Sequence, residues 1–242
     1  MSDDEIKASA INFAKNNKKR IAKELTSIEK YKPDPNPVSV FMAGSPGAGK
    51  TEFSKSLLSI IEKIEKDNKR QVIRIDADEI RPLIPGYLGN NSSLFHGAVS
   101  LVVEKIHDYA LHQKQNFIFD QTFYKYEKAV ENIRRSLGEK RPCIIFYLYQ
   151  DPKVAWDFTK AREVDEGRNI PKEAFIEQFL GARSTVIRVL KEFKGKGVVV
   201  FLVKKNFERN LVEDIVEIEY NDKQIDDHIG KSYTESELNE ML

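Results

Sequence analysis

The sequence predicts an α/β fold of three layers, in which a parallel sheet of about five strands is flanked by helices. From residue 38 to residue 204, short apolar runs alternate with segments of helical periodicity. The apolar runs are nearly continuous, which is typical of parallel strands that helices cover on both faces. A glycine-rich segment follows the first run, where a strand is expected to turn into a helix. The chain has 242 residues, which favours a single domain.

The amino-terminal segment, residues 1 to 37, is expected to be helical and then extended. Ser2 and Glu5 have the spacing of a capping box, and apolar residues recur after them at helical intervals. This pattern predicts one amphipathic helix or a pair of helices. Three prolines between residues 31 and 37 remove backbone donors and favour extended geometry, so we expect a stiff linker into the core.

The core, residues 38 to 204, and a carboxyl-terminal extension, residues 205 to 242, complete the expected domain. Strands are expected at residues 38–43, 72–75, 117–119, 144–149 and 198–203. Helices are expected at residues 53–64, 101–111, 127–137, from 152 onward and 175–193. In the extension, residues 213 to 220 fit either a last strand or a short helix, and Thr234 with Glu237 has the spacing to cap a final helix.

Composition argues against several classes of function. The net charge of +1 provides no overall field that would attract nucleic acid or an anionic membrane. No apolar stretch has the length of a transmembrane helix, and the acidic start lacks the pattern of a secretion signal, so we expect no membrane association and a cytoplasmic location. Cys143 is the only cysteine and lies in an apolar run, which indicates a buried thiol. The four histidines form no i, i+4 pair, so a zinc site is not expected.

The glycine-rich segment fits the pattern G-x-x-x-x-G-K-[ST]. We call it the phosphate loop, and it consists of Gly44, Ser45, Pro46, Gly47, Ala48, Gly49, Lys50 and Thr51. Its glycines let backbone N–H groups point at phosphate oxygens, and the following helix adds its positive N-terminal dipole. The pattern predicts ATP binding, with Lys50 bridging the β- and γ-phosphates and the Thr51 hydroxyl ligating Mg²⁺. Kinases, ATPases and GTPases share this loop, but the chain lacks the N-K-x-D run that reads guanine, which disfavours a GTPase.

Two carboxylates follow the second predicted strand. Asp76 and Asp78 stand at its carboxyl end, the end that faces the ligand crevice in a parallel sheet. Asp78 is therefore the candidate general base, which would accept the proton of an attacking hydroxyl during phosphoryl transfer. For both residues, and above all for Asp76, the alternative is that the carboxylate only caps the next helix.

These residues, together with the phosphate loop, resemble the zeta toxin family. The resemblance consists of Ile75-Asp76-Ala77-Asp78-Glu79-Ile80-Arg81, then Pro85 and Tyr87, then Glu104 on a helix, and finally Phe119-Asp120-Gln121-Thr122. Asp120 stands where the family usually has Glu, and Gln121 where it usually has glycine. The resemblance implies a substrate site made of Asp78, Arg81, Glu104, Asp120 and Thr122. Two structural alternatives stay open: Thr122 caps a helix, and Glu104 is an exposed helix charge.

The same resemblance implies a substrate, cofactors and a protein partner for the chain. Zeta toxins resemble small-molecule kinases and phosphorylate UDP-N-acetylglucosamine, and partner antitoxins hold them inactive by blocking the nucleotide site. The resemblance therefore implies ATP and Mg²⁺ as cofactors and a nucleotide sugar as the small-molecule substrate. It also implies an antitoxin protein as a partner.

Two arginines flank a glycine after the fourth predicted strand. Arg162 lies near the end of a helix that starts at Asp151-Pro152, and Arg168 follows Gly167 ahead of Pro171. The resemblance includes an arginine in this helix and another before a proline. A guanidinium on a mobile segment over the nucleotide can neutralise charge on the transferring phosphoryl group. Arg162 and Arg168 are therefore catalytic candidates, and the alternative is that they pair with acidic neighbours on a solvated helix end.

Three functions compete on these grounds. A zeta-like kinase that acts on a nucleotide sugar would be a growth-inhibiting toxin. A kinase of the same architecture with another hydroxyl acceptor would serve metabolism or resistance. An ATP-dependent regulatory or binding protein would use the nucleotide as a switch and phosphorylate no small molecule. The first two need Asp78 as a base, whereas the third does not.

Overall fold

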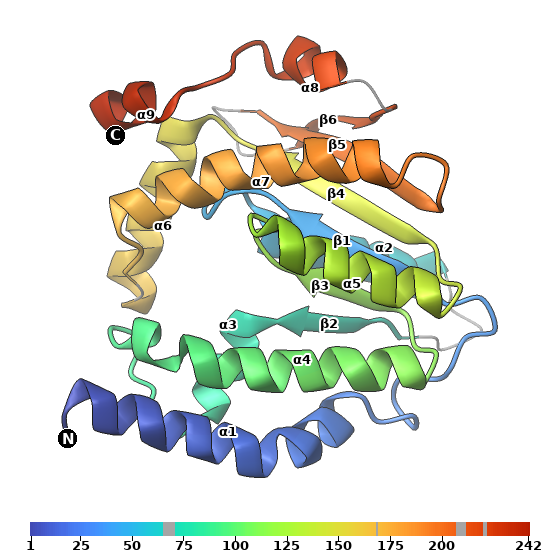
Figure 1. Ribbon diagram of the computed structural model, residues 1–242, viewed down its shortest axis with the longest axis vertical. Coiled ribbons are helices and arrows are strands. Elements are labelled where there is room, and N and C mark those ends of the chain that lie inside the picture. Colours follow the sequence, from blue (N-terminus) through green and yellow to red (C-terminus); the bar gives the residue numbers. More distant parts are fainter. Residues whose placement is uncertain (65–70, 168, 207–211, 220–221) are drawn as a thin grey trace.

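The described part of the chain is built around a sheet of six strands (Figure 1). This computed structural model describes residues 1–64, 71–167, 169–206, 212–219 and 222–242. The strands are β1 (Ser39–Ala43), β2 (Ile73–Asp76), β3 (Phe117–Asp120), β4 (Cys143–Tyr149), β5 (Val198–Lys205) and β6 (Val212–Glu217). Their order is β2-β3-β1-β4-β5-β6, in which β1 to β5 are parallel and β6 is antiparallel to β5. The predicted fold class is confirmed, with one strand more than predicted.

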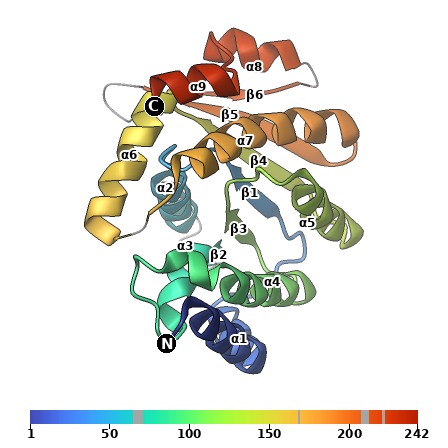
Figure 2. The same ribbon diagram turned by 60° about the vertical axis from the view of Figure 1, so that its left-hand side comes forward.

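Helices cover both faces of this sheet. The helices of the described residues are α1 (Asp3–Leu25), α2 (Lys50–Ile64), α3 (Ala77–Ile80), α4 (His96–His112), α5 (Tyr126–Gly138), α6 (Pro152–Glu166), α7 (Lys172–Glu192), α8 (Asp222–Ile229) and α9 (Glu235–Met241), with the short 3-10 helices η1 (Arg81–Leu83) and η2 (Ser92–Phe95). Figures 1 and 2 show α4, α5 and α7 over one face and α2 over the other. Side chains of β1 alternate between the two cores: Phe41 packs in the larger cluster, and Met42 packs in the cluster that Phe53 of α2 completes.

The carboxyl ends of the parallel strands meet at one edge of the sheet. There β1 leads into the phosphate loop and α2, β2 leads into α3, and β4 leads into α6. β3 and β4 pair with β1 on either side, and all five residues of β1 are buried. The phosphate loop is therefore carried by the middle of a rigid sheet, at the edge where ligands of open α/β folds bind.

The amino-terminal segment packs on the core through α4. α1 is one continuous helix, and its predicted capping box is present, because Ser2 Oγ accepts from the Glu5 N–H and the Glu5 carboxylate accepts from the Ser2 N–H. The buried side chains of α1 are small or apolar, namely Ala10, Ala14, Ile21 and Ala22. Small side chains allow close approach of two helices, and both views show α1 alongside α4.

The carboxyl-terminal segment also joins the core. The region that fits either a strand or a helix contributes to β6, which continues the sheet beyond residue 204. Nearly all residues of β6 are exposed, so its sequence lacks the apolar pattern of a buried strand. The predicted capping box of Thr234 and Glu237 starts α9, and the Tyr233 ring packs edge-on against Phe179 of α7.

The helices and the single cysteine agree with the composition of the chain. In the described ranges, no helix combines the length and the apolar character that crossing a membrane requires. Cys143 is a free, buried thiol of β4, as predicted, and burial raises its pKa to about 12. Such a thiol stays protonated and packs as a small apolar side chain.

Candidate active site

The phosphate loop curls between β1 and α2, and three of its glycines have positive φ. The values are +140° at Gly44, +71° at Gly47 and +82° at Gly49. Lys50 turns back over the loop, and its Nζ donates hydrogen bonds to the carbonyl oxygens of Gly44 at 2.9 Å and Ser45 at 2.7 Å. The ammonium thus lies beside the loop, at the N-terminus of α2, where bound phosphate is expected.

Helix α6 rests directly on the phosphate loop. A Cβ atom on Gly47 would lie 1.9 Å from the carbonyl oxygen of Ala155 and 2.9 Å from Oγ1 of Thr159, so only glycine fits. The far end of α6 approaches the segment after α3, because a Cβ atom on Gly167 would lie 3.6 Å from the backbone nitrogen of Asn90. α6 therefore reaches from the phosphate loop to the segment between α3 and α4 that contains Asn90. We call the region around this segment and α3 the acceptor side. Figure 1 shows α6 beside the sheet.

Asp78 lies in the first turn of α3 and meets α6. α3 begins there because Asp76 caps it, accepting at Oδ1 from the Asp78 N–H at 2.8 Å, as the capping interpretation of Asp76 predicts. The Asp78 carboxylate pairs with Arg81, which is buried, and with Arg162, whose Nη2 lies 3.5 Å from Asp78 Oδ2. Three predicted site residues thus come together, and the Asp78 side chain keeps 28% of its surface exposed. Arg168 lies outside the described residues, so its role stays a prediction.

A buried arginine organises the carboxylates beside Asp78. Arg74 of β2 pairs through Nη2 with Asp76 and with Asp120, the latter at 2.7 Å, and through Nη1 with Glu79. Its Nε donates to Ser54 Oγ of α2 at 2.9 Å. Burial opposes the charge of Arg74, yet the three carboxylates together raise its pKa above the ordinary value. The network ties the ends of β2 and β3 to the helix that follows the phosphate loop.

Asp120 ends β3, and Thr122 lies two residues further along the chain, next to the phosphate loop. The Thr122 carbonyl oxygen accepts a hydrogen bond from the Gly44 N–H at 3.1 Å. Ser54 Oγ lies 3.2 Å from Asp120 Oδ2 and 3.0 Å from the Thr51 carbonyl oxygen. Both residues are therefore adjacent to the loop, and their contact with a substrate stays a prediction.

The donors at this place fit Mg²⁺ if a nucleotide supplies phosphate oxygens. Thr51 offers a hydroxyl and Asp120 a carboxylate, and Ser54 contacts both the backbone carbonyl of Thr51 and the carboxylate of Asp120. Mg²⁺ takes oxygen ligands and usually few of them from the protein, alongside phosphates and water. Among the described residues, no group of three or more His, Cys, Asp or Glu side chains could hold a metal ion. A metal at this site would therefore depend on the nucleotide.

Glu104 lies in a different group of side chains. It belongs to α4 and forms ion pairs with two cations of α5, Lys128 at 2.6 Å and Arg135 at 3.2 Å. Arg135 also pairs with Asp108 of α4. Glu104 thus takes part in an ion-pair network between α4 and α5, and its contact with a substrate stays a prediction.

Sequence reasoning missed Arg74. It interrupts the apolar run from Ile73 to Ile75 in a strand that is expected to be buried on both faces. A charged residue is almost never fully buried without partners, so this position signals an ion-pair network. The sequence alone does not reveal which carboxylates complete it.

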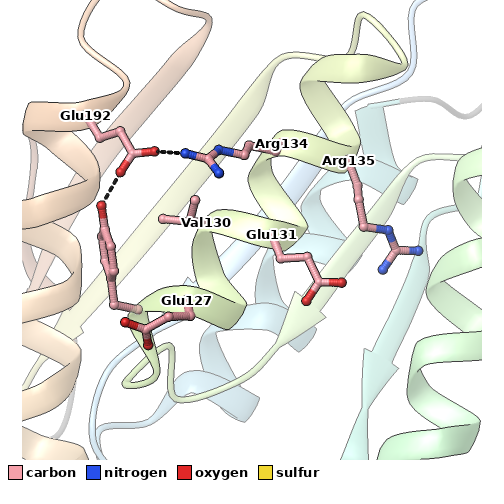
Figure 3. A pocket seen from close by; sticks show the side chains of 7 residues that line it. Glu127, Val130, Glu131, Arg134, Arg135 and Glu192 are labelled. Carbon is pink, nitrogen blue, oxygen red and sulfur yellow. Dashed lines mark hydrogen bonds and ion pairs between the residues drawn. The ribbon is translucent and has the colours of Figure 1, made fainter.

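A separate surface hollow of about 490 Å³ lies along α5 and the end of α7 (Figure 3). Its lining residues are Tyr126, Glu127, Val130, Glu131, Arg134, Arg135 and Glu192. Glu192 is engaged by its neighbours, since it accepts hydrogen bonds from the Tyr126 hydroxyl and from Arg134. The hollow shares no lining residue with the phosphate loop or with the group around Asp78. We place the candidate active site at the carboxyl edge of the sheet, because the phosphate loop and Asp78 both lie there.

Comparison with known proteins identifies the family. The family model described as zeta toxin matches residues 21–217. The chain belongs to the zeta toxin family. The matched region begins within α1 and ends with β6, so it contains the whole sheet of this zeta toxin family member. None of the curated protein sequences compared with the chain matches it.

Solved structures share the fold of this family member at low sequence identity. One comes from the PezAT chromosomal toxin-antitoxin system of Streptococcus pneumoniae, with 14% identity and a TM-score of 0.64, over 94% of this chain and 91% of that one. Another is AvrRxo1-ORF1:-ORF2 with ATP, with 13% identity and a TM-score of 0.61, over 95% of this chain and 74% of that one. Together with the phosphate loop, these similarities define a P-loop kinase-like fold.

Proposed function

We propose that this member of the zeta toxin family transfers the γ-phosphate of ATP to a hydroxyl group of a small molecule. One observation carries the proposal: α6, which rests on the phosphate loop at Gly47, holds Arg162 3.5 Å from Asp78. A phosphate-binding loop, a candidate base and a cation for the transferring group are thus linked by one helix. Phosphoryl transfer depends mainly on such positioning and on charge stabilisation.

In the proposed reaction, Asp78 accepts the proton of the acceptor hydroxyl while the hydroxyl oxygen bonds to the γ-phosphorus. The bond from that phosphorus to the bridging oxygen of ATP breaks, and ADP leaves. Lys50 and the N–H groups of the phosphate loop hold the phosphates, and Arg162 neutralises charge on the transferring group. Arg81 is buried against Asp78 and keeps its carboxylate oriented.

Mg²⁺ is the metal that we propose for this reaction. When bound, it neutralises charge that develops on the phosphate oxygens. Thr51 would supply a hydroxyl ligand and Asp120 a carboxylate oxygen. Arg74 and Ser54 both contact Oδ2 of Asp120, which holds this carboxylate in one orientation. Asp120 would then bind Mg²⁺, either in addition to the predicted contact with the substrate or in its place.

The acceptor that we propose is a nucleotide sugar such as UDP-N-acetylglucosamine, because membership of the zeta toxin family supports it. Arg81, Glu104, Thr122 and Arg168 stay proposed contacts for this acceptor or for the phosphates. The same membership supports a toxic activity in the cytoplasm and an antitoxin partner, since one structural relative belongs to a toxin-antitoxin system.

The test is phosphoryl transfer by the purified chain. The protein is incubated with ATP and Mg²⁺, once with UDP-N-acetylglucosamine and once with a metabolite extract, and products that gain a phosphoryl group are found by mass spectrometry. Asp78→Asn should lower the rate by about 10²-fold or more, whereas the control Asp157→Asn, an exposed aspartate of α6, should not. A product on another metabolite would replace the proposed acceptor and keep the reaction. No phosphorylated product, or an Asp78→Asn variant with full activity, would refute the proposal.

A further inference from the structure

Lys205 is a buried cation beside the phosphate loop. It ends β5 with 4% of its surface exposed. A Cβ atom on Gly49 would lie 3.0 Å from Lys205 Nζ and 3.8 Å from Glu52 Oε2, so the ammonium reaches the loop because residue 49 has no side chain. A register shift of the strand pair falls between Lys204 and Lys205, and Lys204 instead pairs with Glu213 of β6 at 3.6 Å.

The surroundings of Lys205 favour a bound anion. Within the described ranges, its Nζ has neither a hydrogen-bond acceptor nor an ion-pair partner. Burial lowers the pKa of Lys205, and the charge of Glu52 offsets this only in part. The N-terminus of α2, the positive end of a helix dipole, and Lys50 lie at the same loop. Since a buried charge that is only partly compensated is costly, a group of positive charges placed in this way indicates a binding site for an anionic ligand.

The strand order shows which part of the nucleotide faces Lys205. β1 carries the phosphate loop, Asp78 follows β2 on one side of it, and Lys205 ends β5 on the other side. Transfer to an acceptor beside Asp78 requires the γ-phosphate on the β2 side, so the nucleoside end must extend toward β5. We propose that Lys205 binds the α-phosphate of ATP or ADP, the phosphate next to the nucleoside. The inference rests on the proposed function, because it takes ATP as the ligand of the phosphate loop.

Affinity for MgADP tests the inference without any phosphoryl transfer. Lys205→Met removes the charge and keeps most of the aliphatic bulk, and Lys204→Met is the matched control on the same strand. By titration calorimetry, the dissociation constant of MgADP should rise about tenfold or more in Lys205→Met, as for the loss of a hydrogen bond to a charged group. It should change less than about twofold in Lys204→Met, whose lysine pairs with Glu213 at the surface.

The stability of the nucleotide-free variants separates ligand binding from a structural role. Removal of an uncompensated buried cation should leave the melting temperature unchanged or higher, whereas a structural lysine would lower it. Lys205→Gln gives a second comparison with a polar side chain. Unchanged MgADP affinity, a lower melting temperature of the nucleotide-free variants, or failure of both variants to fold would overturn the inference. If the wild-type chain does not bind MgADP, the proposed function fails as well; if it binds MgADP but transfers no phosphate, only the proposed function fails.

Discussion

Replacing Arg74 by methionine tests the buried charge network at the candidate active site. The side chains of Arg74, Asp76 and Asp120 are 7%, 9% and 5% exposed, whereas Glu79 is 54% exposed. Arg74→Met would leave two buried carboxylates without their cation, and the exposed Glu79 would lose little. Removing one partner of a buried ion pair typically lowers the free energy of unfolding by about 3–5 kcal/mol. We therefore expect the free energy of unfolding to fall by about that amount.

Urea denaturation followed by circular dichroism measures this change. For a chain of this size, a loss of about 3–5 kcal/mol corresponds to a melting temperature that is lower by roughly 6–20 °C. Arg20→Met is the matched control, because Arg20 is 65% exposed and pairs with Glu24 along α1. Its effect should stay within about 0.5 kcal/mol.

A double variant identifies the cause. Arg74→Met with Asp120→Asn removes one of the two stranded charges, so its loss of stability should be smaller than the sum of the two single losses by about 1 kcal/mol or more. Additive effects would show that Arg74 and Asp120 are not coupled. An Arg74→Met variant within about 1 kcal/mol of the wild type would refute the reasoning altogether.

Three further variants test other parts of the structure. In urea denaturation, Gly47→Ala should lower the free energy of unfolding by roughly 2–5 kcal/mol, because a positive φ and the contact with α6 both exclude a Cβ atom. Gly138→Ala is the control and should be neutral or stabilising, because a Cβ atom there would have no neighbour within 4 Å; equal stabilities of the two variants would contradict the prediction. Arg162→Met should lower kcat by about 10³-fold, and Lys160→Met on the exposed side of α6 should leave it unchanged; a kcat that survives Arg162→Met would remove this arginine from the mechanism. Burial, and then the neighbouring cations, hold the pKa of His107 well below its usual value, so below about pH 6.5 the unfolded chain binds a proton that the folded chain does not. Stability should therefore fall with decreasing pH, by up to about 1.4 kcal/mol per unit, and less steeply in His107→Phe; equal slopes would exclude His107 as the cause.

The features that sequence predicts well are those that depend on local chemistry. The strands β1 and β4 have continuous apolar runs, and the phosphate loop has a fixed pattern of glycines, so both are recognisable without tertiary information. The placement of Asp78 follows from the direction of a parallel strand. β6 is different, because an exposed edge strand carries no apolar pattern and is defined only by its pairing with β5.

The features that sequence does not predict depend on which side chains meet. Arg74 is a single charge within an apolar run, and Lys205 is the second of two lysines that follow one. The surroundings of both side chains are set by the elements packed around them. The same holds for Glu104, whose partners Lys128 and Arg135 come from another helix. Such pairings are set by tertiary structure, and a single sequence contains no periodic signal for them.

The two ion-pair groups around the acceptor side differ in a way that suits a catalytic cycle. The pair between Arg162 and Asp78 is separated by 3.5 Å, with 40% and 28% of the side chains exposed, so this pair by itself contributes little to stability. The pair between Arg74 and Asp120 is buried at 2.7 Å and cannot open without stranding a charge. Arg162 belongs to a helix that contacts the phosphate loop at Gly47, so in the proposed reaction nucleotide binding would move this arginine from Asp78 to the transferring phosphate, while Arg74 keeps the strand ends in place. The proposed reaction would thus combine a fixed buried network around Arg74 with a more exposed pair beside the proposed base, and phosphoryl transfer depends mainly on such positioning.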